Sequence, residues 1–343
     1  MRPNRLAGLV SWLLLVPTGA SPSVGPVDPA TVYAHAHAHN DYLNDQPLTG
    51  ALGHGFTSVE ADVWLDGGAL VLCHAMRGET CYDDTPGSLG GPRVMPKRRL
   101  EDSYLAPLLS QVGTAGGQVY PGYSGRFLLL IEIKCKREEQ PVCPADQPVD
   151  TWRAIEQQLS RFQSEYHGPG QLFTGYRHGE KHPGAVQVVI TGGYNSQQGT
   201  AGDSVRDHID DPSSTRIAAL DGGASDVTTA TPTAVTPLIS LGWSGATDGG
   251  CVGGGLTTAQ LAAVRAAHDG NYLVRIWGEP DCPRRADHTT DPAKLAAYQR
   301  GREAAWTAIH QLSDTRGNPA VDYISSDHES YLPTWLSAVG WVK

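Results

Sequence analysis

Three histidines and a pair of carboxylates near the N-terminus form a pattern that could do chemistry. His35, His37 and His39 alternate with alanines, and Glu60 and Asp62 are also two residues apart. A period of two predicts β-strands, on which every second side chain lies on the same face. Because a buried row of imidazoles beside two carboxylates is costly, the pattern indicates a metal site or a catalytic site.

A third carboxylate follows in a later segment. Glu132 and Lys134 lie at the end of a continuous apolar run, which is typical of a strand buried on both faces. Three carboxylates with no thiolate beside them are hard oxygen ligands that suit Mg²⁺ or Ca²⁺. We therefore predict one divalent cation held by Glu60, Asp62 and Glu132. We expect Lys134 to pair with Glu132, to bind a substrate phosphate, or to do both.

Histidines on either side of such a cation would suit the cleavage of a phosphodiester. One histidine takes a proton from the attacking hydroxyl and the other protonates the leaving alcohol. His74 is one candidate, and the second is either His37 or His39, between which the sequence does not decide. For His35 we favour a structural place in a polar layer inside the barrel.

Alternating strands and helices must position these residues. Strands are expected at 32–39, 58–65, 126–134, 186–191, 216–220, 236–241, 271–277 and 322–326. Helices are expected at 47–53, 100–112, 149–166, 256–268 and 292–312, with Thr257 or Thr258 as the N-cap of the fourth. A short return strand at 70–73 would end at His74, and 75–99 would be a long loop.

This alternation predicts the α/β class and a parallel sheet. Eight strand–helix units between residues 32 and 343 fit a single closed (β/α)₈ barrel, the TIM barrel. The polar residues named above would then lie at the C-terminal ends of the strands. Barrel enzymes place their chemistry at that rim.

The first residues have the composition of a secretory signal. Arg2 and Arg5 precede the short apolar run Leu6–Val16, so we expect a signal peptide at 1–20 and a flexible leader at 21–31. The apolar run is too short to span a bilayer, and no later segment resembles a transmembrane helix. The expected protein is therefore secreted.

The net charge of the 343 residues is -10, which argues against a nucleic-acid partner and against electrostatic adhesion to anionic lipid. The expected partner is a small-molecule or lipid phosphodiester, with at most transient contact at a membrane surface. No protein partner is expected.

The cysteine count agrees with export. Six cysteines in an oxidising compartment predict disulfides. The pairing local in sequence would be Cys73–Cys81, Cys135–Cys143 and Cys251–Cys282. A zinc site is disfavoured because no CxxC pair is present.

Several of these segments together resemble the PI-PLC-like phosphodiesterase superfamily. The segments are His37–Tyr42 at the end of the first strand, Pro47-Leu48 after it, and Ser58–Val63 and Leu72–His74 on the second strand and its return. Its nearest branches are the glycerophosphodiester phosphodiesterases and the group named for altered inheritance of mitochondria, and the spider-venom sphingomyelinase D type is more distant. Ile131–Lys134 is similar to the third-strand motif of the family, and Val274–Trp277 resembles its seventh-strand motif.

The resemblance implies a barrel with a divalent metal on the three carboxylates and acid–base work by His74 and a first-strand histidine. It also implies an aromatic residue that closes over the substrate. We place Asn40, Arg275 and Trp277 among the substrate-binding residues, and expect Arg275 and Trp277 at the rim. Barrel packing is a competing role for Trp277. The glycerophosphodiesterases have a single His-Arg at the first strand and a small insertion domain that this chain lacks. The substrate therefore stays open among phospholipids, glycerophosphodiesters and related head groups.

Two other functions compete with this one. Metal-dependent amidohydrolase barrels also carry a His-x-His at strand one and an Asp at strand eight, which His37, His39 and Asp327 would match. They require histidines at the ends of strands five and six, where this chain has Asp221 and Trp243. A barrel that binds phosphorylated head groups without catalysis is the second alternative.

Overall fold

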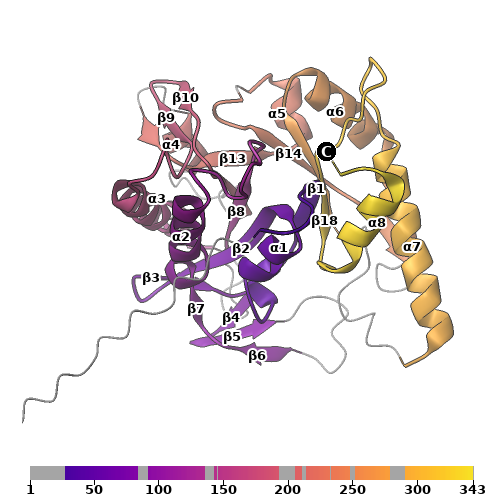
Figure 1. Ribbon diagram of the computed structural model, residues 1–343, viewed down its shortest axis with the longest axis horizontal. Coiled ribbons are helices and arrows are strands. Elements are labelled where there is room, and N and C mark those ends of the chain that lie inside the picture. The colour runs from indigo at the N-terminus through magenta and orange to yellow at the C-terminus, as the bar shows by residue number, and fades with distance from the viewer. Residues whose placement is uncertain are drawn as a thin grey trace, which may run out of the picture.

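Eight parallel strands close into a barrel at the centre of the computed structural model (Figure 1). The structure describes residues 28–83, 92–135, 143–144, 146–192, 205–210, 214–231, 233–247, 252–278 and 290–342. The barrel strands are β1 (Tyr33–Ala38), β2 (Phe56–Asp66), β8 (Leu128–Ile133), β11 (Gln187–Gly192), β13 (Ala219–Gly222), β14 (Leu238–Gly242), β17 (Leu273–Trp277) and β18 (Tyr323–Ser326). They neighbour one another in sequence order, and β18 pairs with β1 to close the ring. The predicted (β/α)₈ barrel is confirmed.

Helices follow the barrel strands, with α2 and α3 on one side of the view in Figure 1 and α7 and α8 on the other. They are α1 (Thr49–Gly53), α2 (Ala106–Thr114), α3 (Gln147–Glu165), α4 (Val205–Ile209), α5 (Ala224–Thr228), α6 (Thr258–Asp269), α7 (Pro292–His310) and α8 (Tyr331–Val339). A short 3₁₀ turn, η1 (Asp41–Leu43), follows β1, and a π-helical turn, η2 (Glu101–Leu105), precedes α2. Thr257 begins α6 with a capping box, in which its hydroxyl accepts from the Gln260 amide, so the predicted cap is confirmed.

The inner face of the barrel changes from apolar to polar along five of its strands, β8, β11, β14, β17 and β18. Deep in the barrel, one buried apolar cluster contains Leu128, Leu130, Val189, Leu238, Leu273 and Tyr323. Side chains two residues further along a strand lie on the same face, and these positions are Glu132, Thr191, Ser240, Arg275 and Ser325. An apolar layer therefore supports a polar layer nearer the C-terminal rim. A second, larger apolar cluster packs the outer faces of the strands against the helices.

The segment from 75 to 99, which we expected to be a loop, contains a small antiparallel sheet. β3 (Ala69–Leu72) returns along β2, and β4 (Ala75–Arg77), β5 (Thr80–Asp83) and β6 (Arg93–Met95) form a three-stranded sheet. β7 (Arg98–Arg99) then pairs with β3. Its strands have two to four residues, too short for a period-two pattern to stand out in the sequence.

Two more small sheets are separate from the barrel sheet. They are β9 (Gly175–Arg177) with β10 (Glu180–His182) and β12 (Thr215–Arg216), and the hairpin of β15 (Ser244–Thr247) and β16 (Val252–Gly255).

Two of the three predicted disulfides are present. Cys73 is bonded to Cys81 and Cys135 to Cys143. The predicted Cys251–Cys282 bond falls outside the described residues, as do the predicted signal peptide and most of the predicted leader. Within the described ranges, no helix combines the length and the apolar character needed to cross a membrane.

Candidate active site

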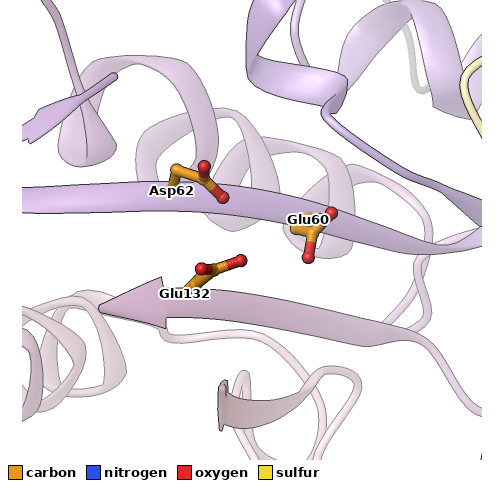
Figure 2. A group of neighbouring side chains, drawn as sticks. All are labelled: Glu60, Asp62 and Glu132. Carbon is orange, nitrogen blue, oxygen red and sulfur yellow. The ribbon is translucent and has the colours of Figure 1, made fainter. Parts of the chain in front are cut away.

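Three carboxylates from two neighbouring strands converge inside the barrel near its rim. Figure 2 shows Glu60 and Asp62 on β2 beside Glu132 near the end of β8. Asp62 and Glu132 are register partners on the two strands, because β2 and β8 pair in parallel. One oxygen atom from each of the three side chains lies within 4.8 Å of the others. The structure therefore brings together the carboxylates that the sequence predicted as metal ligands.

The two carboxylate oxygens of Asp62 differ in their hydrogen-bond partners. Its Oδ2 atom accepts a hydrogen bond from the Tyr42 hydroxyl (2.6 Å) and lies 3.0 Å from Nζ of Lys134. Lys134 Nζ also lies 2.7 Å from Oε1 of Glu132. Burial, together with the negative charges of Glu132 and Glu60, raises the pKa of Asp62 to about 8, although the Lys134 ammonium opposes the shift. Asp62 Oδ1 is buried without a hydrogen-bond partner among the described residues.

Glu60 is buried but surrounded by positive groups and donors. Its Oε2 atom accepts from the main-chain amide of Asn40 (3.2 Å) and lies 3.5 Å from Nε2 of His39. Its Oε1 atom lies 3.6 Å from NH1 of Arg275. Burial acts to raise the pKa of Glu60, but the charges of His39 and Arg275 outweigh it and lower the pKa to about 2. Glu60 is therefore ionised throughout the physiological pH range.

This donor set fits a hard divalent cation. Three carboxylates face one another, with the Lys134 ammonium between two of them and the Arg275 guanidinium beside the third, so the three ionised carboxylates still outnumber the positive charges beside them. Among the described residues the Oδ1 atom of Asp62 has no hydrogen-bond partner, and an uncompensated buried carboxylate oxygen is costly. A Mg²⁺ or Ca²⁺ ion takes carboxylate oxygens as ligands and would remove both costs.

His39 forms a pair with an aspartate from the other end of the chain. Its Nδ1 atom lies 2.8 Å from Oδ1 of Asp327, and its Nε2 atom faces Glu60. About a quarter of the His39 side chain is exposed (24%). Asn40 Nδ2 also donates to Asp327 Oδ1 (3.3 Å). His39 is thus oriented by a carboxylate and accessible from the rim.

His37, the alternative first-strand histidine, is fully buried below His39. Its Nδ1 atom is bonded to Oγ of Ser58 (2.7 Å), and its Nε2 atom lies 3.1 Å from NH1 of Arg275, a donor. Burial and the charge of Arg275 hold the pKa of His37 well below its ordinary value. His37 is therefore a neutral imidazole with both ring nitrogens engaged.

Arg275 is buried, whereas we expected it at the rim. Its Nε atom donates to Ser240 Oγ (2.8 Å), and NH2 lies 3.3 Å from Oδ2 of Asp221. With the contacts to His37 and Glu60, these bonds place Arg275 in the polar layer of the barrel, beside Glu60. The physical reason is its position on β17, two residues before the rim.

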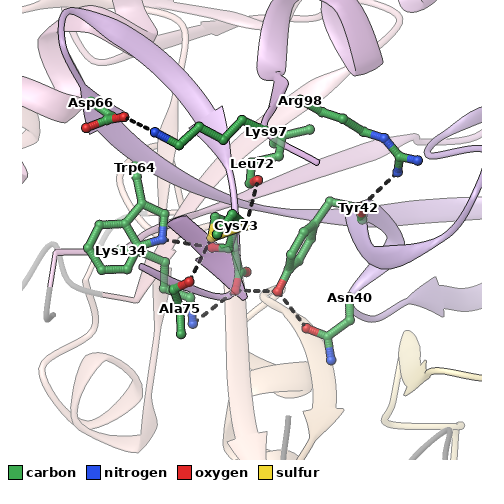
Figure 3. Close-up of a disulfide and its surroundings, with 12 residues drawn as sticks. Asn40, Tyr42, Trp64, Asp66, Leu72, Cys73, Ala75, Lys97, Arg98 and Lys134 are labelled. Atoms are coloured by element: carbon green, nitrogen blue, oxygen red, sulfur yellow. Dashed lines mark hydrogen bonds and ion pairs between the residues drawn. A yellow bond between two sulfur atoms is a disulfide. The ribbon is translucent and has the colours of Figure 1, made fainter. Parts of the chain in front are cut away.

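His74 follows β3 at the edge of the carboxylate site. The amide of Cys73 donates to the carbonyl of Asp62 (3.1 Å), so the chain enters His74 directly beside a predicted metal ligand. Figure 3 shows this junction, where the Trp64 indole donates to the Cys73 carbonyl (2.8 Å). The Cys73–Cys81 disulfide joins the same junction to β5. His74 is half-buried.

Of the remaining predicted residues, Trp277 is exposed at the rim and Asn40 is buried. Trp277, at the end of β17, is 44% exposed and is therefore available to a ligand. Asn40 is buried in the left-handed conformation (φ 52°), and its Oδ1 atom lies 3.0 Å from the Tyr42 hydroxyl. His35 does not join the histidine row that we expected. The register of β1 shifts between Tyr33 and His37, and the His35 ring stacks on Trp341.

Sequence reasoning missed three residues of this site. Asp327 was considered only as a mimic of an amidohydrolase ligand, and Tyr42 and Asp221 were given no role. The signal for Asp327 was its place directly after an expected strand. Its histidine partner follows from closure of the barrel, since β1 and β18 are far apart in sequence but adjacent in space.

Comparison with known proteins points to one family. The model of an AIM6-like phosphodiesterase domain matches residues 28–85. Three curated relatives are each named "Altered inheritance of mitochondria protein 6". The relative from Eremothecium gossypii is 27% identical over 273 residues, covering 74% of this chain and 62% of its own length. The one from Zygosaccharomyces rouxii is 23% identical over 266 residues, covering 72% and 61%.

The relative from Kluyveromyces lactis is 34% identical over 135 residues, which cover 32% of this chain and 29% of that protein. The chain thus spans less than two thirds of the length of these relatives. The family match includes the histidine row, Glu60, Asp62 and His74, which are the first half of the site. The matches confirm the resemblance to the AIM6 branch of the PI-PLC-like phosphodiesterase superfamily, over residues 28–85 for the family model and over 72–74% of this chain for the two longer relatives.

Proposed function

We propose that this protein is a metal-dependent phosphodiesterase that cleaves a phosphodiester of a phospholipid, a glycerophosphodiester or a related head group. The observation that carries the proposal is the His39–Asp327 pair beside three converging carboxylates. The family match supports the same reaction class. Glu60, Asp62 and Glu132 are the proposed ligands of one Mg²⁺ or Ca²⁺ ion.

His39 and His74 are the proposed acid–base pair. We choose His39 over His37 because His39 is accessible, while His37 is buried with both ring nitrogens engaged. Asp327 accepts the Nδ1 proton of His39, so Nε2, which faces Glu60, is the ring nitrogen that would exchange a proton with the substrate. His74 would exchange a proton with the oxygen on the other side of phosphorus, so that one histidine deprotonates the attacking hydroxyl and the other protonates the leaving alcohol. Proton transfer of this kind contributes on the order of 10²- to 10⁴-fold to a rate.

The other polar groups have supporting roles. When bound, the cation would offset the negative charge that develops on the phosphate oxygens. Lys134 adds a positive charge beside Asp62 and Glu132, within reach of a phosphate oxygen at the same place. Trp277 offers an exposed indole face on which a head group can pack.

Two routes of cleavage are compatible with this arrangement. A hydroxyl of the substrate next to the phosphate can attack phosphorus, which expels the alcohol and gives a cyclic phosphate. Attack by water instead gives a phosphomonoester and the alcohol. Phosphorus NMR of the first product separates the two routes.

A screen of phosphodiester substrates with and without chelator tests the proposal. We expect turnover of at least one lipid-derived phosphodiester, its loss on chelation, and its loss in Asp62→Asn. Asp66→Asn is a matched control, because Asp66 lies on the same strand and pairs with Lys97 outside the site. Binding of such ligands without turnover would favour the non-catalytic alternative. Amide hydrolysis with zinc would favour the amidohydrolase alternative.

We also propose that the protein is exported. The leader-like composition of residues 1–20 and the two disulfides in the described chain support this. Recovery of the protein from the culture medium, with its N-terminus near residue 21, would be the expected result. Retention of the intact chain inside the cell would contradict it.

A further inference from the structure

Arg98 connects the two segments that carry the proposed acid–base histidines. It lies on β7, where its main chain pairs with Leu72 of β3, two residues before His74. Its side chain extends in the other direction, to the loop after β1 that begins at His39. Figure 3 shows Arg98 reaching the main chain of Tyr42.

The guanidinium group of Arg98 binds three main-chain carbonyls of that loop. NH1 donates to the carbonyl of Asn44 (2.5 Å) and lies 3.4 Å from that of Tyr42. NH2 donates to the carbonyl of Asp45 (3.3 Å). A planar guanidinium presents several donors in a fixed fork, so it can hold several carbonyls in one relative arrangement.

The loop held in this way contributes one histidine and two hydrogen bonds to the site. Its first residue is His39, its Asn40 amide donates to Glu60, and its Tyr42 hydroxyl donates to Asp62. Asn40 has a left-handed backbone, which a non-glycine residue keeps only when its surroundings fix it. A shift of the loop would therefore move a histidine and two carboxylate contacts together.

A second anchor holds the far end of the same loop. The buried Asp41 carboxylate accepts from the Leu48 amide (2.7 Å) and from the Tyr104 hydroxyl (2.5 Å). Leu48 also has a positive φ of 60°. Asp41 thus ties the loop to the start of α1 and to η2, whereas Arg98 ties it to the segment that carries His74.

We propose that Arg98 is a positioning residue that sets the His39 loop relative to His74. The inference rests on the proposed function for its catalytic part, and on the three carbonyl contacts for its structural part. Arg98 contacts neither the carboxylates nor the two histidines through any hydrogen bond found in the described chain. It would act through the loop geometry.

Three variants test this. Arg98→Gln removes the fork, and Arg98→Lys keeps the charge but holds fewer carbonyls. Arg99→Gln makes the same charge change at the next residue of β7, which is exposed. Hydrogen exchange of the amides of residues 40–48 should become faster in Arg98→Gln, less so in Arg98→Lys, and stay at the wild-type rate in Arg99→Gln.

The catalytic part is tested in two backgrounds. Arg98→Gln should lower kcat on the order of 10²-fold with KM nearly unchanged, because small displacements of catalytic groups cost that much. In a His74→Ala background the same change should cost far less, since the relative position of the two histidines no longer matters. An equal loss of activity in both backgrounds would overturn the positioning role.

The two proposals fail in different ways. If the wild type cleaves no phosphodiester, the proposed function is wrong, and the exchange measurement alone decides whether Arg98 holds the loop. Unchanged hydrogen exchange of residues 40–48 in Arg98→Gln and Arg98→Lys would show that Arg98 does not hold the loop, even if the enzyme is active.

Discussion

The Nδ1 atom of His39 lies 2.8 Å from Oδ1 of Asp327, although 288 positions separate the two residues in the chain. Closure of the barrel produces this contact. Ala38 and Ser326 are register partners on β1 and β18, and the His39 amide donates to the Ser326 carbonyl (3.0 Å). His39 and Asp327, which each follow the last residue of their strand, therefore lie side by side at the rim.

Replacement of Asp327 by asparagine should impair catalysis without unfolding the protein. The amide keeps the size of the carboxylate but loses the charge that stabilises a protonated His39. We expect kcat to fall on the order of 10²-fold, within the range that general acid–base groups contribute. Steady-state kinetics checks this, with cation affinity as the control. A variant with the kcat of the wild type would show that Asp327 does not orient the base.

His37 and His39 should respond differently to alanine substitution. Loss of His37 leaves the Ser58 hydroxyl and an NH group of Arg275 without their buried partner, which costs about 1–3 kcal/mol of folding free energy. Loss of His39, which is partly exposed, should leave stability nearly unchanged and lower kcat by about 10²- to 10⁴-fold. Urea unfolding and kinetics on both variants measure the two effects. The reverse pattern would assign the acid–base role to His37.

The Cys73–Cys81 disulfide should hold the His74 junction in place. A pair of serines at these positions removes a bond of this type, which typically stabilises a fold by 2–4 kcal/mol, as a rough guide. We expect a lower melting temperature and faster hydrogen exchange in residues 73–83. The same double substitution at Cys135 and Cys143 is the matched control, and it should leave exchange at the His74 junction unaltered. Equal hydrogen exchange at that junction in both variants would show that the Cys73–Cys81 disulfide does not hold the junction in place.

Cation binding should release a proton from Asp62 near neutral pH. The pKa of Asp62 is raised to about 8, chiefly by burial, so the carboxyl is largely protonated at neutral pH until a cation binds. Without a cation, this shift stabilises the fold fully below the ordinary pKa of 3.8, and the contribution is lost as the pH rises towards 8.

Calorimetric titration of Mg²⁺ or Ca²⁺ in buffers with different ionisation enthalpies measures the released proton. We expect release at neutral pH, a decline of the release above pH 8, and no release in Asp62→Asn. Binding without proton release at neutral pH in the wild type would contradict the raised pKa.

The sequence predicted the barrel and the carboxylates because both depend on local patterns. The apolar run of β8 is buried on both faces and ends with Glu132, and Glu60 and Asp62 share a face because strands have a period of two. The same period failed for His35, because an irregularity in β1 changes the register between Tyr33 and His37. A bulge of this kind depends on pairing with β2, which a single segment does not encode.

Long-range contacts account for the rest of what the sequence did not reveal. Asp327 meets His39 only after the barrel closes, and Arg98 meets the carbonyls of a loop about fifty positions earlier. Arg275 was expected at the rim. Its burial depends on partners on other strands, Glu60, Asp221 and Ser240, which its own segment does not encode.

Diffraction from a crystal soaked in Mn²⁺, an anomalous scatterer that takes the same oxygen ligands as Mg²⁺, tests the central claim most directly. The account predicts one anomalous peak bound by Glu60, Asp62 and Glu132, with His39 and His74 on either side, and no such peak in Asp62→Asn. A wild-type crystal with no peak at these carboxylates, or with the ion bound elsewhere in the barrel, would contradict it.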